Sequence, residues 1–171
     1  FPGQGSIRDC MRELAHWNLT DVVRDAALGK PFLGLCLGPQ ALLDFSEEND
    51  GVAGLGVLPG RVVRFADPRD PATGERLKVP HMGWNQVRQV SDHPLWRGIP
   101  QDSRFYFVHS YYCAPEDESV VAAVCDYGQP FCASVLKDNL FATQFHPEKS
   151  GRPGLRLLRN FYDYCVEGKD A

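Results

Sequence analysis

The chain has 171 residues, of which 43% are hydrophobic and 23% charged, and its formal net charge is −4. This length fits one domain, residues 1–171, built on one substantial hydrophobic core. The slightly acidic balance, without any basic run, argues against nucleic acid or a membrane surface as a partner. No apolar stretch approaches the roughly 18 residues that a membrane span needs, and no signal peptide is visible.

The first quarter of the chain predicts two helices followed by a short buried strand. Residues 6–17 carry apolar side chains at helical spacing, with Ser6 as a candidate N-cap. A second helix is expected over 20–28, ending at Gly29. The apolar residues 32–35 predict a strand of the buried parallel type, and residues 40–43 belong to the helix that follows it.

Short strands dominate the rest of the chain. A turn-rich stretch at 47–59 precedes a strand at 61–65, and residues 66–76 are typical of an irregular loop. Further strands are expected over 85–90, 104–109, 119–127, 131–136 and 140–145, and a final helix over 153–165. Helices before and after a strand-rich middle predict an α/β fold with some antiparallel strands.

The sequence Gly-Leu-Cys-Leu-Gly at 34–38 connects the first predicted strand to its helix. This is the pattern of a nucleophile elbow with Cys36 in the nucleophile position, because flanking glycines allow a sharp turn that projects the central side chain. The backbone amide of Leu37 is then placed to donate to an oxyanion. A helix N-terminus is expected to lower the pKa of the thiol. A buried structural cysteine in a Gly-flanked turn is the alternative.

A second candidate motif follows the strand predicted at 140–145. His146 could abstract the thiol proton and return it to a leaving amine, and Glu148 could hold the imidazole in the productive tautomer. Carboxyl ends of strands are where open α/β sheets place their sites. Read in isolation, His146 would more simply be a loop histidine bonded to Glu148. The Gly-rich segment Gly3-Gln4-Gly5 could supply a second oxyanion amide, or could be an ordinary turn.

The remaining cysteines and histidines do not suggest a metal or a disulfide framework. Six cysteines are scattered without a C-x-x-C pair, a usage typical of reduced cytoplasmic thiols. Five histidines lack the clustered spacing of a zinc site. We therefore expect neither a metal nor an organic cofactor, and a cytoplasmic location.

Taken together, these motifs resemble those of the class I glutamine amidotransferases, whose Cys, His and Glu triad occurs in this chain order. The elbow and the His-Pro-Glu motif are shared widely in that family, whereas His-Met-Gly-Trp-Asn and Phe-Val-His-Ser-Tyr are similar to the branch that serves imidazole glycerol phosphate synthesis, in histidine biosynthesis. The matching segments are residues 1–5, 34–40, 80–85, 106–112 and 144–151.

The resemblance implies an open, mostly parallel sheet flanked by helices, with additional antiparallel strands. It also implies that Cys36, His146 and Glu148 form a catalytic triad that hydrolyses L-glutamine to glutamate and ammonia. By the same resemblance, the polar end of glutamine would contact Gln40, Ser110 and Tyr111, beside the loop at 3–5.

A partner is implied as well: a cyclase subunit with a (β/α)8 barrel fold, which would receive the ammonia in a heterodimer. The residues expected to face it are Trp84, Asn85, Tyr106, His109 and Lys149. The family begins with a strand–helix–strand unit ahead of the Pro-Gly loop, so this sequence is expected to lack that unit at its N-terminus. Three other functions stay open at this point: an amidotransferase subunit of another synthase, a stand-alone thiol hydrolase, and a non-enzymatic interaction module.

Overall fold

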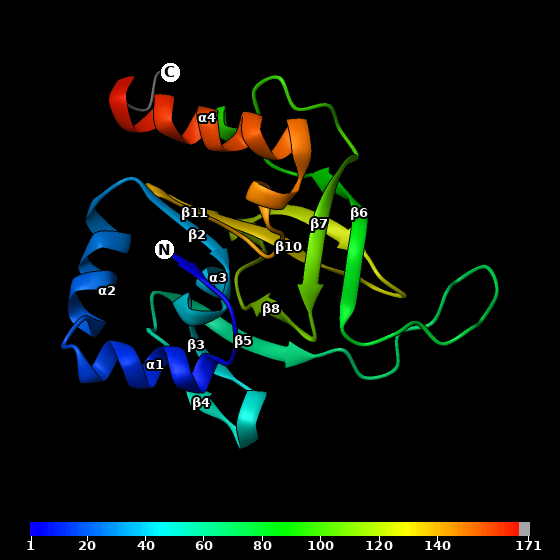
Figure 1. Ribbon diagram of the computed structural model, residues 1–171, viewed down its shortest axis with the longest axis horizontal. Coiled ribbons are helices and arrows are strands. Elements are labelled where there is room, and N and C mark those ends of the chain that lie inside the picture. Colours follow the sequence, from blue (N-terminus) through cyan, green and yellow to red (C-terminus); the bar gives the residue numbers. More distant parts are fainter. Residues whose placement is uncertain (168–171) are drawn as a thin grey trace.

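The computed structural model describes residues 1–167 of the chain (Figure 1). Four α-helices are present in this part: α1 (Ile7–His16), α2 (Thr20–Gly29), α3 (Leu37–Leu42) and α4 (Gly151–Glu167). The strands are β1 (Pro2–Gly3), β2 (Phe32–Cys36), β3 (Leu43–Ser46), β4 (Val52–Ala53), β5 (Leu58–Arg64), β6 (His81–Gln89), β7 (Ser103–His109), β8 (Tyr111–Pro115), β9 (Val121–Asp126), β10 (Pro130–Lys137) and β11 (Leu140–Thr143).

The strands form one strongly curled mixed sheet. Its main path runs β1-β2-β11-β10-β8-β5-β3-β4, and β9 continues from β10 to the β6–β7 hairpin. Among the described residues, β1–β2, β2–β11 and β3–β5 pair in parallel, whereas the other pairings are antiparallel. The α/β class with antiparallel additions is therefore confirmed, but the antiparallel share is larger than expected. Tight turns join β9 to β10 and β10 to β11, and such turns can join only antiparallel neighbours.

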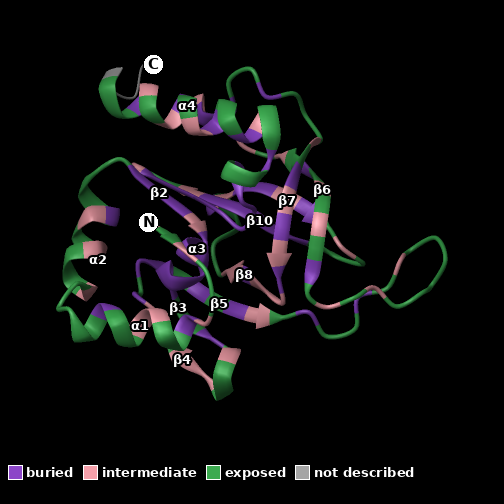
Figure 2. Ribbon diagram, in the orientation of Figure 1, coloured by how far each residue is buried: buried purple, intermediate pink, exposed green. Residues whose placement is uncertain are grey.

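Helices cover the sheet from two sides (Figure 1). On one side α1 and α3 enclose a core that includes Ile7 and Leu42, both fully buried. On the other side α4 packs on a second core, to which it contributes Leu157 and Tyr164. The buried strands between these two layers are visible in Figure 2. The strands that carry the catalytic candidates are therefore packed against a hydrophobic core on each face.

Most predicted elements are present, with local differences. The first helix begins as expected, because the Ser6 side chain accepts a hydrogen bond from the Asp9 amide. The apolar run at 40–43 is divided, however: α3 ends at Leu42 and β3 begins at Leu43. Strand β8 was not predicted, and neither were the two-residue strands β1 and β4.

The loop between β5 and β6 extends from the body of the molecule and is largely exposed (Figure 2). Its Asp67 carboxylate pairs with Arg69 and Arg76, which organises the irregular segment expected there. No helix within residues 1–167 is long and apolar enough to cross a membrane.

Candidate active site

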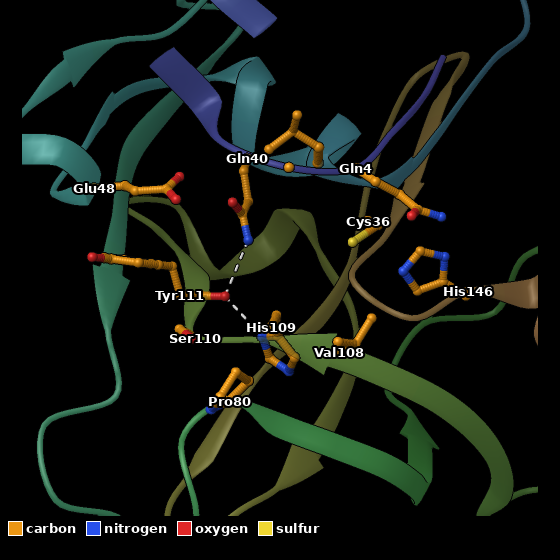
Figure 3. A pocket seen from close by; sticks show the side chains of 12 residues that line it. Gln4, Cys36, Gln40, Glu48, Pro80, Val108, His109, Ser110, Tyr111 and His146 are labelled. Atoms are coloured by element: carbon orange, nitrogen blue, oxygen red, sulfur yellow. Dashed lines mark hydrogen bonds between the residues drawn. The ribbon is translucent and has the colours of Figure 1, made fainter. Parts of the chain in front are cut away.

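Cys36 occupies a strained turn between β2 and α3. Its backbone angles are φ 55° and ψ −84°, in a region that residues other than glycine rarely adopt. Both flanking positions are crowded, which favours glycine: a Cβ on Gly34 would lie 2.9 Å from the Ala142 Cβ, and one on Gly38 would lie 3.0 Å from the Phe1 carbonyl oxygen. This geometry confirms the predicted elbow and directs the thiol toward a pocket (Figure 3).

His146 and Glu148 follow β11, on the strand next to β2 in the sheet. His146 Nδ1 lies 2.7 Å from Glu148 Oε1, so the imidazole donates this hydrogen to the carboxylate. The His146 amide donates to the Tyr106 carbonyl at 2.9 Å, and the Tyr106 amide in turn donates to Ser150 Oγ. The catalytic loop is thereby fixed to β7 as well as to its own strand.

Cys36 and His146 line the same cavity of about 280 Å³, and Figure 3 shows both side chains at one end of it. With Nδ1–H committed to Glu148, the other ring nitrogen, Nε2, is an acceptor. That Nε2 is buried and has no hydrogen-bond partner within residues 1–167. A hydrogen bond from the thiol to this nitrogen, which would precede the predicted proton abstraction, is therefore not formed in the resting geometry, although the two groups share the pocket. Catalytic hydrogen bonds are often long until substrate binds.

The expected lowering of the thiol pKa is wrong for this resting state. Burial of the Cys36 side chain, together with the negative charge of Glu148, raises its pKa to about 11, although the positive charge of Lys149 opposes the rise. Helix α3 has only six residues. Its N-terminus therefore does not offset the loss of solvent around the sulfur.

The loop at 3–5 lies against the elbow, as predicted. Gly3 is the β1 partner of Cys36 in the parallel β1–β2 pair. A Cβ on Gly3 would lie 3.1 Å from the Leu37 Cβ, so glycine allows the loop to pack closely on the elbow. Gln4, Gly5 and Leu37 all line the cavity. The two candidate oxyanion donors, the Leu37 amide and the loop, are thus on the same wall as the thiol.

The three residues expected to contact glutamine all reach the cavity. Gln40, Ser110 and Tyr111 line it at the end away from His146 (Figure 3). Gln40 Nε2 donates to the Tyr111 carbonyl at 3.1 Å and to Gln144 Oε1 at 3.0 Å. Gln144 Nε2 donates to the Cys36 carbonyl at 3.2 Å, which links the elbow to this wall.

Two residues in or beside the cavity were missed from sequence. Glu48 lines it and accepts a hydrogen bond from the Ile7 amide at 3.0 Å, tying the start of α1 to the pocket rim. Nothing in the turn-rich stretch around Glu48 signalled this role. Gln144 is 1% exposed, and its position two residues before His146 was the signal available for it.

Four of the five residues expected at a partner surface lie on the β6–β7 hairpin and are divided between its two faces, whereas Lys149 follows β11. Trp84 is exposed and pairs with Tyr106 across the hairpin, and their rings meet edge to face. Lys149 Nζ stands 6.0 Å from the centre of the Tyr106 ring. Asn85 and His109 point the other way, because side chains alternate along a strand. His109 is 6% exposed, so the expectation that it forms part of the surface is wrong.

Within the described residues, no three His, Cys, Asp or Glu side chains are grouped so as to hold a metal ion. A cysteine on a strained strand-to-helix turn, a buried imidazole oriented by a carboxylate, and a Gly-rich loop beside the thiol make up the arrangement of a triad-type thiol hydrolase acting on acyl compounds.

Comparison with known proteins specifies the family. Residues 2–165 match the model of the family described as glutamine amidotransferase class-I. The chain is 57% identical over 166 residues to the imidazole glycerol phosphate synthase subunit HisH of Aromatoleum aromaticum, covering 96% of this chain and 78% of that relative. It is 60% identical over 163 residues to the subunit of the same name from Methylococcus capsulatus, covering 94% of this chain and 75% of that one.

Solved structures agree on the fold. A crystal structure described as a glutamine amidotransferase gives a TM-score of 0.66 at 21% identity, covering 96% of this chain and 77% of that one. A glutamine amidotransferase from Thermotoga maritima gives 0.60 at 18% identity, covering 99% and 64%. The chain belongs to the class-I glutamine amidotransferase family, in the group of HisH subunits of imidazole glycerol phosphate synthase.

Proposed function

We propose that this chain is the glutaminase subunit of an imidazole glycerol phosphate synthase and hydrolyses glutamine with Cys36, His146 and Glu148. The observation that carries the proposal is the unpartnered acceptor nitrogen of buried His146, which faces the same cavity as the thiol. A neutral imidazole in this state can receive one proton, and the thiol lies at the same end of the cavity (Figure 3).

The reaction begins when the side-chain amide of glutamine enters between the thiol and the loop at 3–5. The thiol proton passes to His146 Nε2 as the sulfur attacks the amide carbon. Glu148 stabilises the imidazolium that forms, through the 2.7 Å contact with Nδ1. Because burial and Glu148 raise the thiol pKa to about 11, ionisation is confined to the moment when the imidazole takes the proton.

Charge then develops on the amide oxygen, and the Leu37 amide and the loop at 3–5 are the donors on that side of the cavity. His146 returns its proton to the nitrogen, and ammonia leaves as the carbon–nitrogen bond breaks. The glutamyl group remains on Cys36 as a thioester. Water, activated by His146, hydrolyses it to glutamate and restores the thiol.

The far end of the cavity suits the α-amino acid part of glutamine. The volume of the whole cavity, about 280 Å³, is at the lower limit of small-molecule sites. Glu48 offers a carboxylate to the α-ammonium group, and Ser110 and Gln40 offer hydrogen-bonding atoms. The charged α-amino acid part of glutamine is then recognised at the far end of the cavity, and the side-chain amide lies beside the thiol.

The partner we propose is the cyclase subunit, a (β/α)8 barrel that receives the ammonia. Trp84, Tyr106 and Lys149 form an aromatic and basic cluster next to the catalytic loop, in which Trp84 and Lys149 are exposed and Tyr106 is half-buried. An interface there would act directly on His146, whose amide bonds the Tyr106 carbonyl. The six cysteines are free thiols, which agrees with action in the cytoplasm.

The experiment that tests this function is a comparison of two nitrogen sources in the assembled complex with the cyclase subunit. Cys36→Ala should abolish glutamine-dependent formation of imidazole glycerol phosphate and leave the ammonia-dependent rate intact. The matched control is Cys10→Ala, half-buried on α1 outside the cavity, which should retain both rates. Retention of glutamine-dependent turnover by Cys36→Ala would refute the nucleophile. A purified chain that hydrolyses glutamine fully without any partner would support a stand-alone hydrolase instead.

A further inference from the structure

Two buried histidines outside the triad contact each other below the cavity. His81 on β6 and His109 on β7 are directly opposed in the antiparallel hairpin and are 3% and 6% exposed. Their ring nitrogens, His81 Nδ1 and His109 Nε2, are 2.9 Å apart. Burial lowers the pKa of His81 to about 4 and that of His109 to about 3. Both imidazoles are therefore neutral near pH 7, and each carries a single ring proton.

The neighbouring groups determine which nitrogen carries each proton. His109 Nδ1 lies 2.7 Å from the Tyr111 carbonyl, which only accepts, so the proton of His109 is on Nδ1. His109 Nε2 must then accept from His81 Nδ1–H. His81 Nε2 is consequently an acceptor, and it receives the amide of Asn85 at 3.3 Å. Each proton assignment determines the role of the next nitrogen, so one arrangement of protons satisfies all three contacts.

The orientation of the Asn85 amide is fixed independently. Its Nδ2 also donates to the Asp126 carbonyl at 2.8 Å, and its Oδ1 accepts from the Gln86 amide at 2.8 Å. A reversed amide would lose both bonds. The hydrogen bonds therefore all run in one direction, from half-buried Asn85 on β6 to the Tyr111 carbonyl on the cavity wall.

At the inner end, the Tyr111 carbonyl accepts a second hydrogen, from Gln40 Nε2 (Figure 3). The other hydrogen of that nitrogen goes to Gln144 Oε1. Both hydrogens of the Gln40 amide are thus committed to the wall, and the Gln40 oxygen is the atom left for a ligand. A glutamine substrate brings the hydrogen-bond donors that such an oxygen needs.

We propose that Asn85, His81 and His109 are positioning residues for glutamine binding. They form a hydrogen-bond relay, with both imidazoles in the Nδ1–H tautomer, that fixes the Tyr111 carbonyl. The carbonyl in turn fixes the amide of Gln40 so that its oxygen faces the substrate. The role in glutamine binding rests on the proposed function, whereas the tautomers of the relay do not.

The relay also keeps positive charge away from the catalytic imidazole. His146 and His109 are close enough to interact electrostatically. The mechanism makes His146 cationic when it takes the thiol proton, and a second imidazolium beside it would oppose that step. With Nε2 committed to His81 as an acceptor, His109 has no free nitrogen to protonate.

The tautomers can be measured directly by nitrogen NMR of the full chain labelled with ¹⁵N-histidine, in complex with its partner at pH 7.5. We expect His81 and His109 each to show a protonated Nδ1 and an unprotonated Nε2. An Nε2–H tautomer or a doubly protonated ring at either residue would overturn the relay. This measurement does not depend on glutaminase activity. A complex that fails to hydrolyse glutamine would refute the proposed function, but the tautomers of His81 and His109 could still be determined.

The kinetic test compares two substitutions of the central histidine. The amide nitrogen of His81→Asn can replace Nδ1–H as the donor to His109, whereas His81→Leu cannot. We expect His81→Leu to raise KM for glutamine roughly 3- to 10-fold, as for one lost hydrogen bond, with kcat within about twofold, and His81→Asn to restore most of the loss. Equal KM values for the two would overturn the positioning role.

A second pair of variants tests the relay at a less buried position, in case the His81 variants do not fold. Asn85→Leu removes the outer donor at a half-buried position, and Gln86→Ala, on the opposite face of the same strand, is its matched control. Assayed with saturating partner, Asn85→Leu should raise KM and Gln86→Ala should not. An unchanged KM for Asn85→Leu would contradict the relay even if both His81 variants fail to fold.

Discussion

The ionisation state of the Cys36 thiol gives the sharpest prediction. With a pKa of about 11, only about one thiol in a thousand is ionised at pH 8. Alkylation by iodoacetamide, which requires the thiolate, should therefore accelerate about tenfold per pH unit between pH 7 and 9. A thiolate–imidazolium pair already formed at rest would instead give a rate that is flat over this range.

Substitutions of the two charged neighbours should move this rate in opposite directions. The Glu148 charge raises the thiol pKa and Lys149 lowers it. Glu148→Gln should therefore speed alkylation at pH 8, about tenfold for each unit by which the pKa falls, and Lys149→Met should slow it. Glu148→Gln should at the same time reduce glutaminase activity by about 10³- to 10⁴-fold, because the imidazole loses its orienting carboxylate.

The assay follows the peptide containing Cys36 by mass spectrometry in a Cys10→Ser, Cys165→Ser background, since those two cysteines are the less buried ones. Glu116→Gln, at an exposed carboxylate on the chain surface, is the matched control and should change neither rate. Slower alkylation in Glu148→Gln, or a rate independent of pH between 7 and 9, would refute this account of the thiol.

Three further predictions concern stability and assembly. Burial lowers the pKa of His81 and His109 in the folded state. Below pH 6.5 the unfolded chain therefore binds protons at these two residues that the folded chain does not, and the folded state becomes less stable as the pH falls. The free energy of unfolding from urea titrations should drop by roughly 3 kcal/mol between pH 6.5 and 5, and a flat profile would contradict this. Gly34→Ala should cost about 1–3 kcal/mol in the same titration, since its Cβ would meet Ala142 at 2.9 Å; a neutral effect would mean that the elbow can relax. Trp84→Ala should weaken partner binding at least roughly 30-fold by calorimetry without lowering the melting temperature, whereas unchanged affinity would exclude this face.

The chemistry of the site was largely predictable because it depends on local patterns. A strand, two glycines around Cys36 and a helix can be recognised in one short segment, and His146 with Glu148 in another. That β2 and β11 are neighbours, which brings the two segments to one cavity, was not predicted from either segment, since the family resemblance implied only that the three residues form a triad. The pKa of the thiol was mispredicted because burial is a property of the whole fold.

Other features depend on register, which the sequence does not display. Trp84 and Asn85 are adjacent in the chain, yet one is exposed and the other joins a buried relay, since each step along a strand reverses the face. Strand β8 was missed because Tyr111–Pro115 is short and ends in proline. Leu43 was assigned to a helix because an apolar run does not distinguish a helix end from a buried strand.

The measurement that tests the central claim most directly is the capture of the acyl-enzyme. The complex with its partner is mixed with ¹⁴C-glutamine, quenched in acid within the first turnover, and digested for mapping. We predict a labile glutamyl thioester on the peptide that carries Cys36, absent from His146→Ala, which cannot take the thiol proton. Label on another residue, or turnover without any covalent glutamyl intermediate, would contradict the account.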